Sequence, residues 1–243
     1  WMADKLLTYA KKDSIPHQTV VISDSKSMAR VAKIRNAYPD LKILTSELDI
    51  EGKEQYYIEF ESVQKALSPG RTLVFLETNN ESFASNVTSM LNGLNGLTLE
   101  LQEAENEAEE EVEIEVEREL ILMTTNHNKA FKGSHISNSD LSNLNFQFPS
   151  VYNYNEGLSD FGKNYKSRYG NYPSRYATRG FDLALDLLLR LVAFESLYME
   201  LTNTQTKYLE NKFKYAQPQS GGYVNQSAYI LKYQDLFVIK MED

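Results

Sequence analysis

Apolar residues in the first half of the chain follow two alternating spacings. Short, nearly continuous apolar runs are typical of buried strands, and they occur at residues 17–24, 41–45, 72–76 and 120–123. Between these runs apolar residues recur every three or four positions, which predicts helices over residues 2–13, 25–38, 54–67 and 83–91. Strands that alternate with helices indicate βαβ units and a parallel sheet, and therefore an α/β fold.

The second half of the chain has a different order of elements. The pattern predicts an extended stretch, three helices and a turn, at residues 144–154, 159–169, 179–198, 204–213 and 220–223. Two strands then follow around the turn Gln234-Asp235, at residues 228–233 and 236–240. We expect these strands to form an antiparallel hairpin near the end of the chain.

The carboxyl ends of the predicted parallel strands carry polar residues. In α/β sheets ligands bind beyond these ends. The residues at this position are Asp24-Ser25, Glu77-Thr78-Asn79 and Thr124-Thr125-Asn126. From these groups, the candidate ligand-binding residues are Asp24, Ser25, Thr78, Thr125 and Asn126.

The negative charge of the chain is concentrated in one segment. Residues 100–119 hold eleven Glu and one Arg, whereas the rest of the chain holds 24 basic and 23 acidic residues, within a total net charge of −9. Because no excess of Lys or Arg is available for phosphates, we expect no nucleic-acid partner. The segment is either a site for a cation or a protein partner, or a solvated insertion, and the second interpretation is favoured.

The acidic segment divides into two patterns. Residues 102–111 contain few apolar positions, which indicates a mobile loop or a weak helix. Residues 112–117 alternate between apolar and Glu, which predicts an edge strand or an extension leading into the strand at 120–123. We therefore expect an α/β lobe over residues 1–126 with an insertion at about 98–118. Residues 127–243 then supply the continuation of the lobe, crossover helices and the hairpin.

Few residues suggest catalysis or metal binding. The absence of Cys excludes disulfides, thiolate metal sites and a Cys nucleophile. The three histidines, His17, His127 and His135, lack metal-ligand spacing. His127 follows a predicted strand end and could touch a ligand, but a histidine on a surface loop is the favoured interpretation. No Gly-x-Ser-x-Gly elbow is present. We predict a non-enzymatic protein without a cofactor or a metal site.

Residues 157–163 match the first seven positions of a phosphate-binding loop. The eighth position is Asn164, where Ser or Thr should hold the metal. A helix start capped by Ser159 is the favoured interpretation. From Lys163 to Arg179, basic residues then alternate with tyrosines, a mixture that could stack against sugars or nucleobases. The alternative, which we favour, is a helix with Phe161 and Tyr165 inward and its bases in solvent.

The C-terminal half resembles the type I periplasmic binding-protein family. The resemblance lies in residues 161–173, which end in Tyr169-Gly170 and Pro173, and in residues 176–182, which read Tyr-Ala-Thr-Arg-Gly-Phe-Asp. Residues 210–213, residues 221–225 and the hairpin look like a Bacteroidetes envelope branch, in which this domain is often joined to LysM peptidoglycan-binding repeats.

The resemblance implies a three-layer α/β sandwich built from two lobes, with most of the first lobe missing here. It implies a periplasmic or cell-envelope protein that binds a small polar solute, such as an amino acid or a cell-wall fragment, without catalysis. An acid such as Asp24 would hold an ammonium group, and hydroxyl and amide groups would fix polar atoms. The alternative is an envelope scaffold that keeps the fold, binds no solute and contacts a protein partner.

The sequence contains no candidate membrane span. No apolar run approaches the roughly 18 residues that a transmembrane helix needs. Because the chain begins Trp1-Met2, we expect a mature protein or a piece of a longer one.

Overall fold

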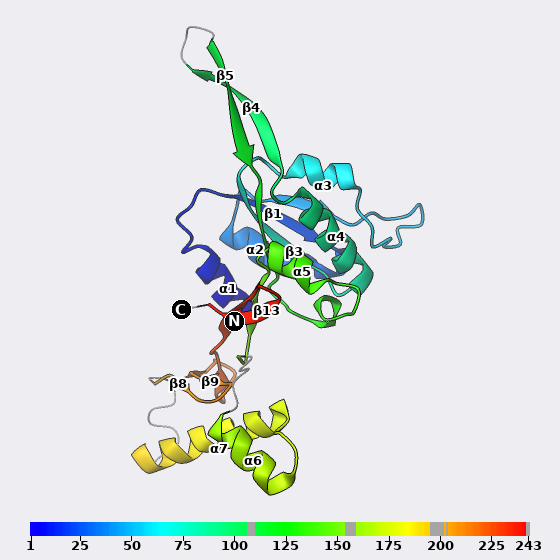
Figure 1. The fold of residues 1–243 in the computed structure, drawn as a ribbon. Helices are drawn as coiled ribbons and strands as arrows, with labels where there is room; N and C mark the ends of the chain where they lie inside the picture. The colour runs from blue at the N-terminus through cyan, green and yellow to red at the C-terminus, as the bar shows by residue number, and fades with distance from the viewer. Residues whose placement is uncertain (106–109, 154–158, 195–201, 203, 242–243) are drawn as a thin grey trace. The chain divides into compact units, whose positions relative to one another are not determined.

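The chain forms two compact units in a computed structural model (Figure 1) that describes residues 1–105, 110–153, 159–194, 202 and 204–241. Unit 1 contains residues 1–5, 150–231 and 240–243. Unit 2 contains residues 6–149 and 232–239. The chain therefore passes between the units more than once.

A mostly parallel sheet forms the centre of unit 2. Its strands, in spatial order, are β2 (Lys42–Thr45), β1 (Gln18–Ser23), β3 (Arg71–Glu77), β6 (Glu119–Met123), β7 (Gln147–Ser150), β12 (Tyr229–Gln234) and β13 (Phe237–Lys240). Neighbouring strands from β2 to β7 run parallel. Asp235 and Leu236, both at positive φ, form the turn between β12 and β13, as a two-residue hairpin requires. The predicted α/β fold with a C-terminal hairpin is confirmed.

Helices cover both faces of this sheet. The helical elements before β7 are α1 (Met2–Ala10), η1 (Ser25–Ser27), α2 (Met28–Ala37), α3 (Phe60–Ala66), α4 (Glu81–Leu94), η2 (Lys129–Phe131) and α5 (Asn138–Asn143). Figure 1 shows α3, α4 and α5 on one side of the sheet and α2 on the other, as right-handed crossovers require. Residues 20–22 of β1 and 73–76 of β3 are fully buried, which explains their continuous apolar runs.

One predicted helix is shorter than expected. Residues 54–67 were expected to be helical throughout, but α3 begins only at Phe60. The preceding residues form a tight turn, in which the Asp49 carboxylate accepts hydrogen bonds from the backbone N–H groups of Glu51 and Lys53. Leu48 and Glu54 form an isolated antiparallel bridge around this turn. The backbone N–H of Gln55 donates to Glu47, and that of Glu47 donates to Tyr57, so pairing across this turn occupies the first residues of the predicted helix.

The acidic segment is an antiparallel hairpin, β4 (Thr98–Glu105) and β5 (Glu110–Glu117). Figure 1 shows the hairpin extending away from the sheet of unit 2. The expected loop or weak helix at 102–111 is wrong for residues 102–105 and 110–111, which are strand, and residues 106–109 lie outside the described part of the chain. The expected extension at 112–117 is confirmed, but it pairs with β4 rather than forming an edge of the main sheet.

Shortening this hairpin should leave the fold intact. Replacing residues 102–113 by Asn-Gly keeps the pair Leu101↔Ile114 and joins it by a two-residue turn. The described strand positions in this stretch, 102–105 and 110–113, pair only with each other, so we expect the free energy of unfolding to change by less than about 1 kcal/mol in urea denaturation. The buried core variant Leu73→Ala is the positive control, with an expected loss of about 2–5 kcal/mol. A comparable loss for the shortened hairpin would show that the segment belongs to the core.

Two helices, α6 (Asp160–Tyr169) and α7 (Arg175–Phe194), supply most of the regular structure of unit 1. The Ser159 hydroxyl accepts the backbone N–H of Gly162 at 3.1 Å, which confirms the predicted cap. Gly170 ends α6 at φ +81, a conformation that glycine adopts without strain. Helix α6 half-buries Phe161 and Tyr165 and exposes its basic side chains, in agreement with the favoured interpretation of this segment.

Helix α7 buries a polar stripe. Thr178, Asp182, Asp186 and Arg190 recur every four residues and are all buried. The Arg190 guanidinium pairs with Asp186, Nε to Oδ2, at 3.0 Å. Leu188 and Val192 on the same helix are 61% and 83% exposed. The apolar spacing that predicts this helix therefore does not mark its buried face.

The helix predicted over residues 204–213 is not formed. The segment instead contains the two-residue strands β8 (Thr206–Lys207) and β9 (Lys212–Phe213), paired antiparallel. Between them, the Asp182 carboxylate accepts the backbone N–H groups of residues 209, 210 and 211 at 3.0–3.1 Å. A side chain distant in sequence thus supplies the acceptors that a helix would take from its own carbonyls. A second small hairpin, β10 (Tyr215–Ala216) and β11 (Val224–Asn225), follows.

Candidate functional site

The candidate site lies at the carboxyl ends of β1, β3 and β6, which we call the carboxyl edge. From β1 the chain proceeds to β2 on one side and later from β3 to β6 on the other, so the strand order reverses between β1 and β3. Ser23 and Glu77 are partners in the register of these two strands. The next residues, Asp24 and Thr78, are therefore brought together, and such a reversal point is where open α/β sheets bind ligands.

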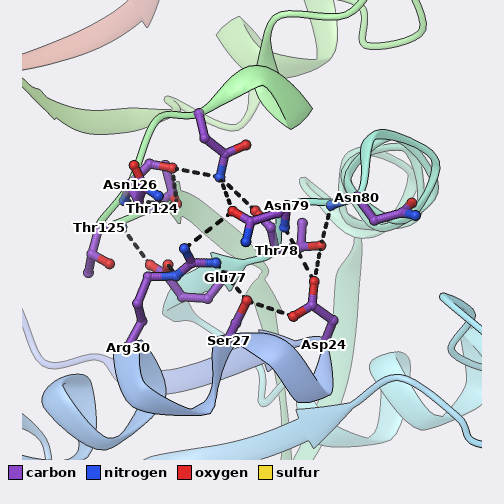
Figure 2. A network of polar contacts seen from close by, with 11 residues as sticks. Asp24, Ser27, Arg30, Glu77, Thr78, Asn79, Asn80, Thr124, Thr125 and Asn126 are labelled. Atoms are coloured by element: carbon purple, nitrogen blue, oxygen red, sulfur yellow. Dashed lines mark hydrogen bonds and ion pairs between the residues drawn. The ribbon is translucent and has the colours of Figure 1, made fainter. Parts of the chain in front are cut away.

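Asp24 joins the loops that follow β1 and β3 (Figure 2). Its carboxylate accepts hydrogen bonds from the hydroxyls of Ser27 and Thr78, each at 2.6 Å, and from the backbone N–H of Asn79 at 3.3 Å. Asp24 is 1% exposed and Thr78 is fully buried. Both carboxylate oxygens of Asp24 are thus engaged by the protein, and the residue fixes the geometry of the two loops.

Glu77 and Arg30 form a buried ion pair beside Asp24. The Arg30 Nε lies 2.8 Å from Glu77 Oε2, and Glu77 is fully buried. Glu77 Oε1 accepts the backbone N–H of Thr125 at 2.5 Å, which ties the loop after β6 to β3. Burial raises the pKa of Glu77 to about 7, although the hydrogen bonds from Thr125 and the charge of Arg30 oppose this shift. The Glu77 carboxyl therefore titrates near neutral pH.

The loop after β6 completes the edge. The Asn128 side-chain amide donates to the backbone carbonyl of Thr78 at 2.8 Å and to Asn79 Oδ1 at 2.9 Å. Thr125 is 4% exposed, whereas Asn126 is half-buried. The three strand–loop junctions are therefore linked to one another by hydrogen bonds before any ligand arrives.

Solvent reaches this edge at a few polar groups. Asn79 is exposed and Asn126 is half-buried. Ser25 is also exposed, and its backbone N–H donates to Glu54 Oε2 at 3.0 Å. Within the described residues, the hydroxyl of Ser25 and the side-chain N–H groups of Asn79 and Asn126 have no hydrogen-bond partner in the protein. These groups are available to a ligand.

The predicted site residues take two different places. Asp24, Thr78 and Thr125 are buried and hold the loops, while Ser25 and Asn126 lie at the surface of the same edge. Ser27, Arg30 and Asn128 belong to the site but were not among the predicted residues. A weak signal existed for two of them, because Ser27 and Arg30 lie three and six residues after Asp24 at the start of α2.

His127 packs into the core of unit 2. Its ring lies 3.7 Å from that of Phe148, centroid to centroid. Burial, aided by the charge of Lys132, lowers its pKa to about 3, so the ring is neutral at physiological pH. Across the described part of the chain, no three or more His, Asp or Glu side chains are grouped to hold a metal ion. None of the helices described is long and apolar enough to cross a bilayer.

Comparisons with known proteins find similarity only among solved structures. No family model and no curated protein matches the chain. An extracellular ligand-binding receptor from Rhodopseudomonas palustris HaA2 matches with a TM-score of 0.45 and 15% identity, over 99% of this chain and 68% of the receptor. Another extracellular ligand-binding receptor from Rhodopseudomonas palustris matches with a TM-score of 0.47 and 14% identity, over 99% and 67%. Similarity of this degree assigns no residue a role, so the function is argued from the carboxyl edge.

Proposed function

We propose that the protein is a non-enzymatic binding protein of the cell envelope that takes a small polar solute at the carboxyl edge of unit 2. The observation that supports this most is the convergence of three strand–loop junctions at the point where the strand order reverses. The hydrogen bonds of Asp24, Glu77 and Asn128 fix these loops in advance, which reduces the entropy lost on binding. The resemblance of residues 161–182 to periplasmic binding proteins supports the same function.

The groups at the edge suit uncharged polar atoms of a ligand. The Asp24 carboxylate already accepts three hydrogen bonds, and Glu77 is paired with Arg30. The free groups are the side-chain N–H groups of Asn79, the side-chain amide of Asn126 and the Ser25 hydroxyl. We therefore propose that these groups contact the hydroxyl, amide or carbonyl groups of an amino acid or a cell-wall fragment, while the carboxylates hold the loops.

Calorimetric titration tests the proposal. The full chain is titrated with the twenty L-amino acids and with N-acetylmuramyl-L-alanyl-D-isoglutamine. We expect at least one to bind with a Kd of about 100 μM or tighter. The double variant Asn79→Ala/Asn126→Ala should weaken binding at least about tenfold, because it removes two hydrogen-bonding side chains at the edge. Asn36→Ala, on the exposed side of α2, is the matched control and should bind normally. No heat from any probe would contradict the proposal.

The hydrogen bonds that the carboxyl edge already makes within the protein favour one alternative function. The carboxylate oxygens of Asp24 and Glu77 already accept hydrogen bonds from protein groups. The loops could therefore be stable without a solute, as in an envelope scaffold. A scaffold would show no solute binding and would form a stoichiometric complex with one envelope protein, purified and identified. Solute binding that is lost in the Asn79→Ala/Asn126→Ala variant excludes this alternative.

A further inference from the structure

Unit 1 contains a small cavity at the start of α7, separate from the carboxyl edge. Its volume is about 80 Å³. The lining residues are Tyr152, Arg175, Tyr176, Arg179, Glu210 and Asn211. Two arginines, two tyrosines, one carboxyl and one amide therefore face a space that can hold a few non-hydrogen atoms.

Arg175 is held in place by two tyrosines. Its guanidinium lies over the rings of Tyr152 and Tyr176, 5.7 and 5.0 Å from their centroids. It also donates hydrogen bonds to the hydroxyls of Tyr152 at 3.3 Å and Tyr176 at 3.1 Å. These two bonds use two of the five N–H donors of the Arg175 guanidinium.

Arg179 adds a second positive charge to the same cavity. It lies one helical turn after Arg175, so the two side chains share a face of α7. Within the described residues, its guanidinium has no ion-pair or hydrogen-bond partner. An arginine that lines a cavity and lacks a partner can donate its N–H groups to an anion that enters the cavity.

The opposite wall is preformed by hydrogen bonds and carries a single carboxyl, against the two arginines of α7. Asp182 accepts the backbone N–H groups of Glu210 and Asn211 and the Asn211 side-chain amide at 2.9–3.0 Å. Glu210 is half-buried, and burial, then the charge of Asp182, raises the pKa of its carboxyl. The cavity therefore keeps a net positive character with a preformed wall.

We propose that this cavity binds the oxoanion group of a small solute, a carboxylate or a phosphate, through the guanidinium groups of Arg175 and Arg179. A carboxylate and a phosphate can each accept two parallel N–H hydrogen bonds from one guanidinium, in bidentate geometry. The Tyr176 hydroxyl accepts from Arg175, so its own hydrogen is free to donate to the same anion. The site lies in unit 1 and does not depend on the solute site proposed for unit 2.

Side-chain NMR of the full chain tests this site. Sodium acetate, sodium phosphate and glycine are titrated separately at constant ionic strength, and the arginine Nε–Hε resonances are followed. We expect saturable shifts of the Arg175 and Arg179 signals with a Kd of about 1 mM or tighter for at least one probe. The anion that binds more tightly, acetate or phosphate, identifies the class of oxoanion. If glycine binds more tightly than acetate, the ammonium group of glycine adds a contact with Glu210.

Charge variants separate a specific site from general attraction. Arg179→Gln should weaken binding of the best probe at least about tenfold, and Arg179→Lys should weaken it less because the charge remains. Arg35→Gln, an exposed position on α2 in unit 2, removes the same charge elsewhere and should leave the Kd within about twofold. Equal losses in Arg35→Gln and Arg179→Gln, or no saturation below about 20 mM with any probe, would overturn the proposal.

Discussion

Replacing Arg30 with Met should lower the free energy of unfolding by about 2 kcal/mol at pH 8, because it leaves the buried Glu77 carboxyl without its cation. At pH 5.5 the loss should fall to about 1 kcal/mol, the value of the hydrogen bonds that Arg30 donates to Ser27 and Asn79. The difference arises because Glu77, with a pKa of about 7, is already protonated in the native wild type at pH 5.5. Chemical denaturation at the two pH values measures both losses.

The sign of the pH effect follows from proton linkage. The native pKa of Glu77 is raised from the ordinary 4.5 to about 7, so between these values the native chain holds a proton that the unfolded chain has released. The contribution of Glu77 to stability is therefore lost as the pH rises through this window. Without Arg30 the native pKa rises further, and the loss continues above pH 7.

A matched double variant isolates the ion pair. Arg30→Met/Glu77→Gln removes both charges and keeps the size of the buried side chain, so the extra loss at pH 8 should disappear. Equal losses in Arg30→Met at pH 8 and pH 5.5 would show that Arg30 acts only through contacts that do not depend on the charge of Glu77, such as its hydrogen bonds to Ser27 and Asn79. In that case the ionised pair would not stabilise the carboxyl edge.

Replacing Asp182 with Ala should be the most disruptive single change in unit 1. It removes the acceptor of three backbone N–H groups and of the Asn211 side-chain amide. Each unsatisfied donor costs about 1–3 kcal/mol when buried, so we expect a loss of about 3 kcal/mol or more. Amide hydrogen exchange at residues 209–211, followed by mass spectrometry, should accelerate in proportion.

Two controls accompany this prediction. Asp182→Asn keeps one acceptor oxygen and should lose less than Asp182→Ala. Asp160→Ala removes a carboxylate that is 93% exposed on α6 and should change stability by less than about 0.5 kcal/mol. Unchanged exchange at residues 209–211 in Asp182→Ala would mean that the turn between β8 and β9 is held by other contacts.

Elements whose structure is set by their own residues could be predicted from the sequence, whereas elements held by residues distant in the sequence could not. Strands β1 and β3 were predicted because their apolar runs are continuous, and they are continuous because helices bury both faces of the sheet. The start of α3 was mispredicted because residues 54–57 pair with residues 47 and 48 across the turn at Asp49. Residues 204–213 were mispredicted because their hydrogen-bond acceptor, Asp182, lies more than twenty residues away.

The site was predictable in position and less so in its details. Parallel strands place Asp24 and Thr78 at one edge, and the register of β1 and β3 brings them into direct contact. The partner of Glu77 comes from α2, and the sequence does not show which face of that helix turns toward the edge. A short helix such as α5, with one buried residue, also leaves no periodic pattern to find.

The central claim is that the carboxyl edge of unit 2 binds a small polar solute. Backbone ¹H–¹⁵N NMR of the full chain, titrated with the L-amino acids and with N-acetylmuramyl-L-alanyl-D-isoglutamine, tests it most directly. We expect saturable shifts confined to the loops after β1, β3 and β6, with Asn79 and Asn126 among the most affected. Spectra that remain unchanged with every probe, or saturable shifts that spare all three loops, would contradict it.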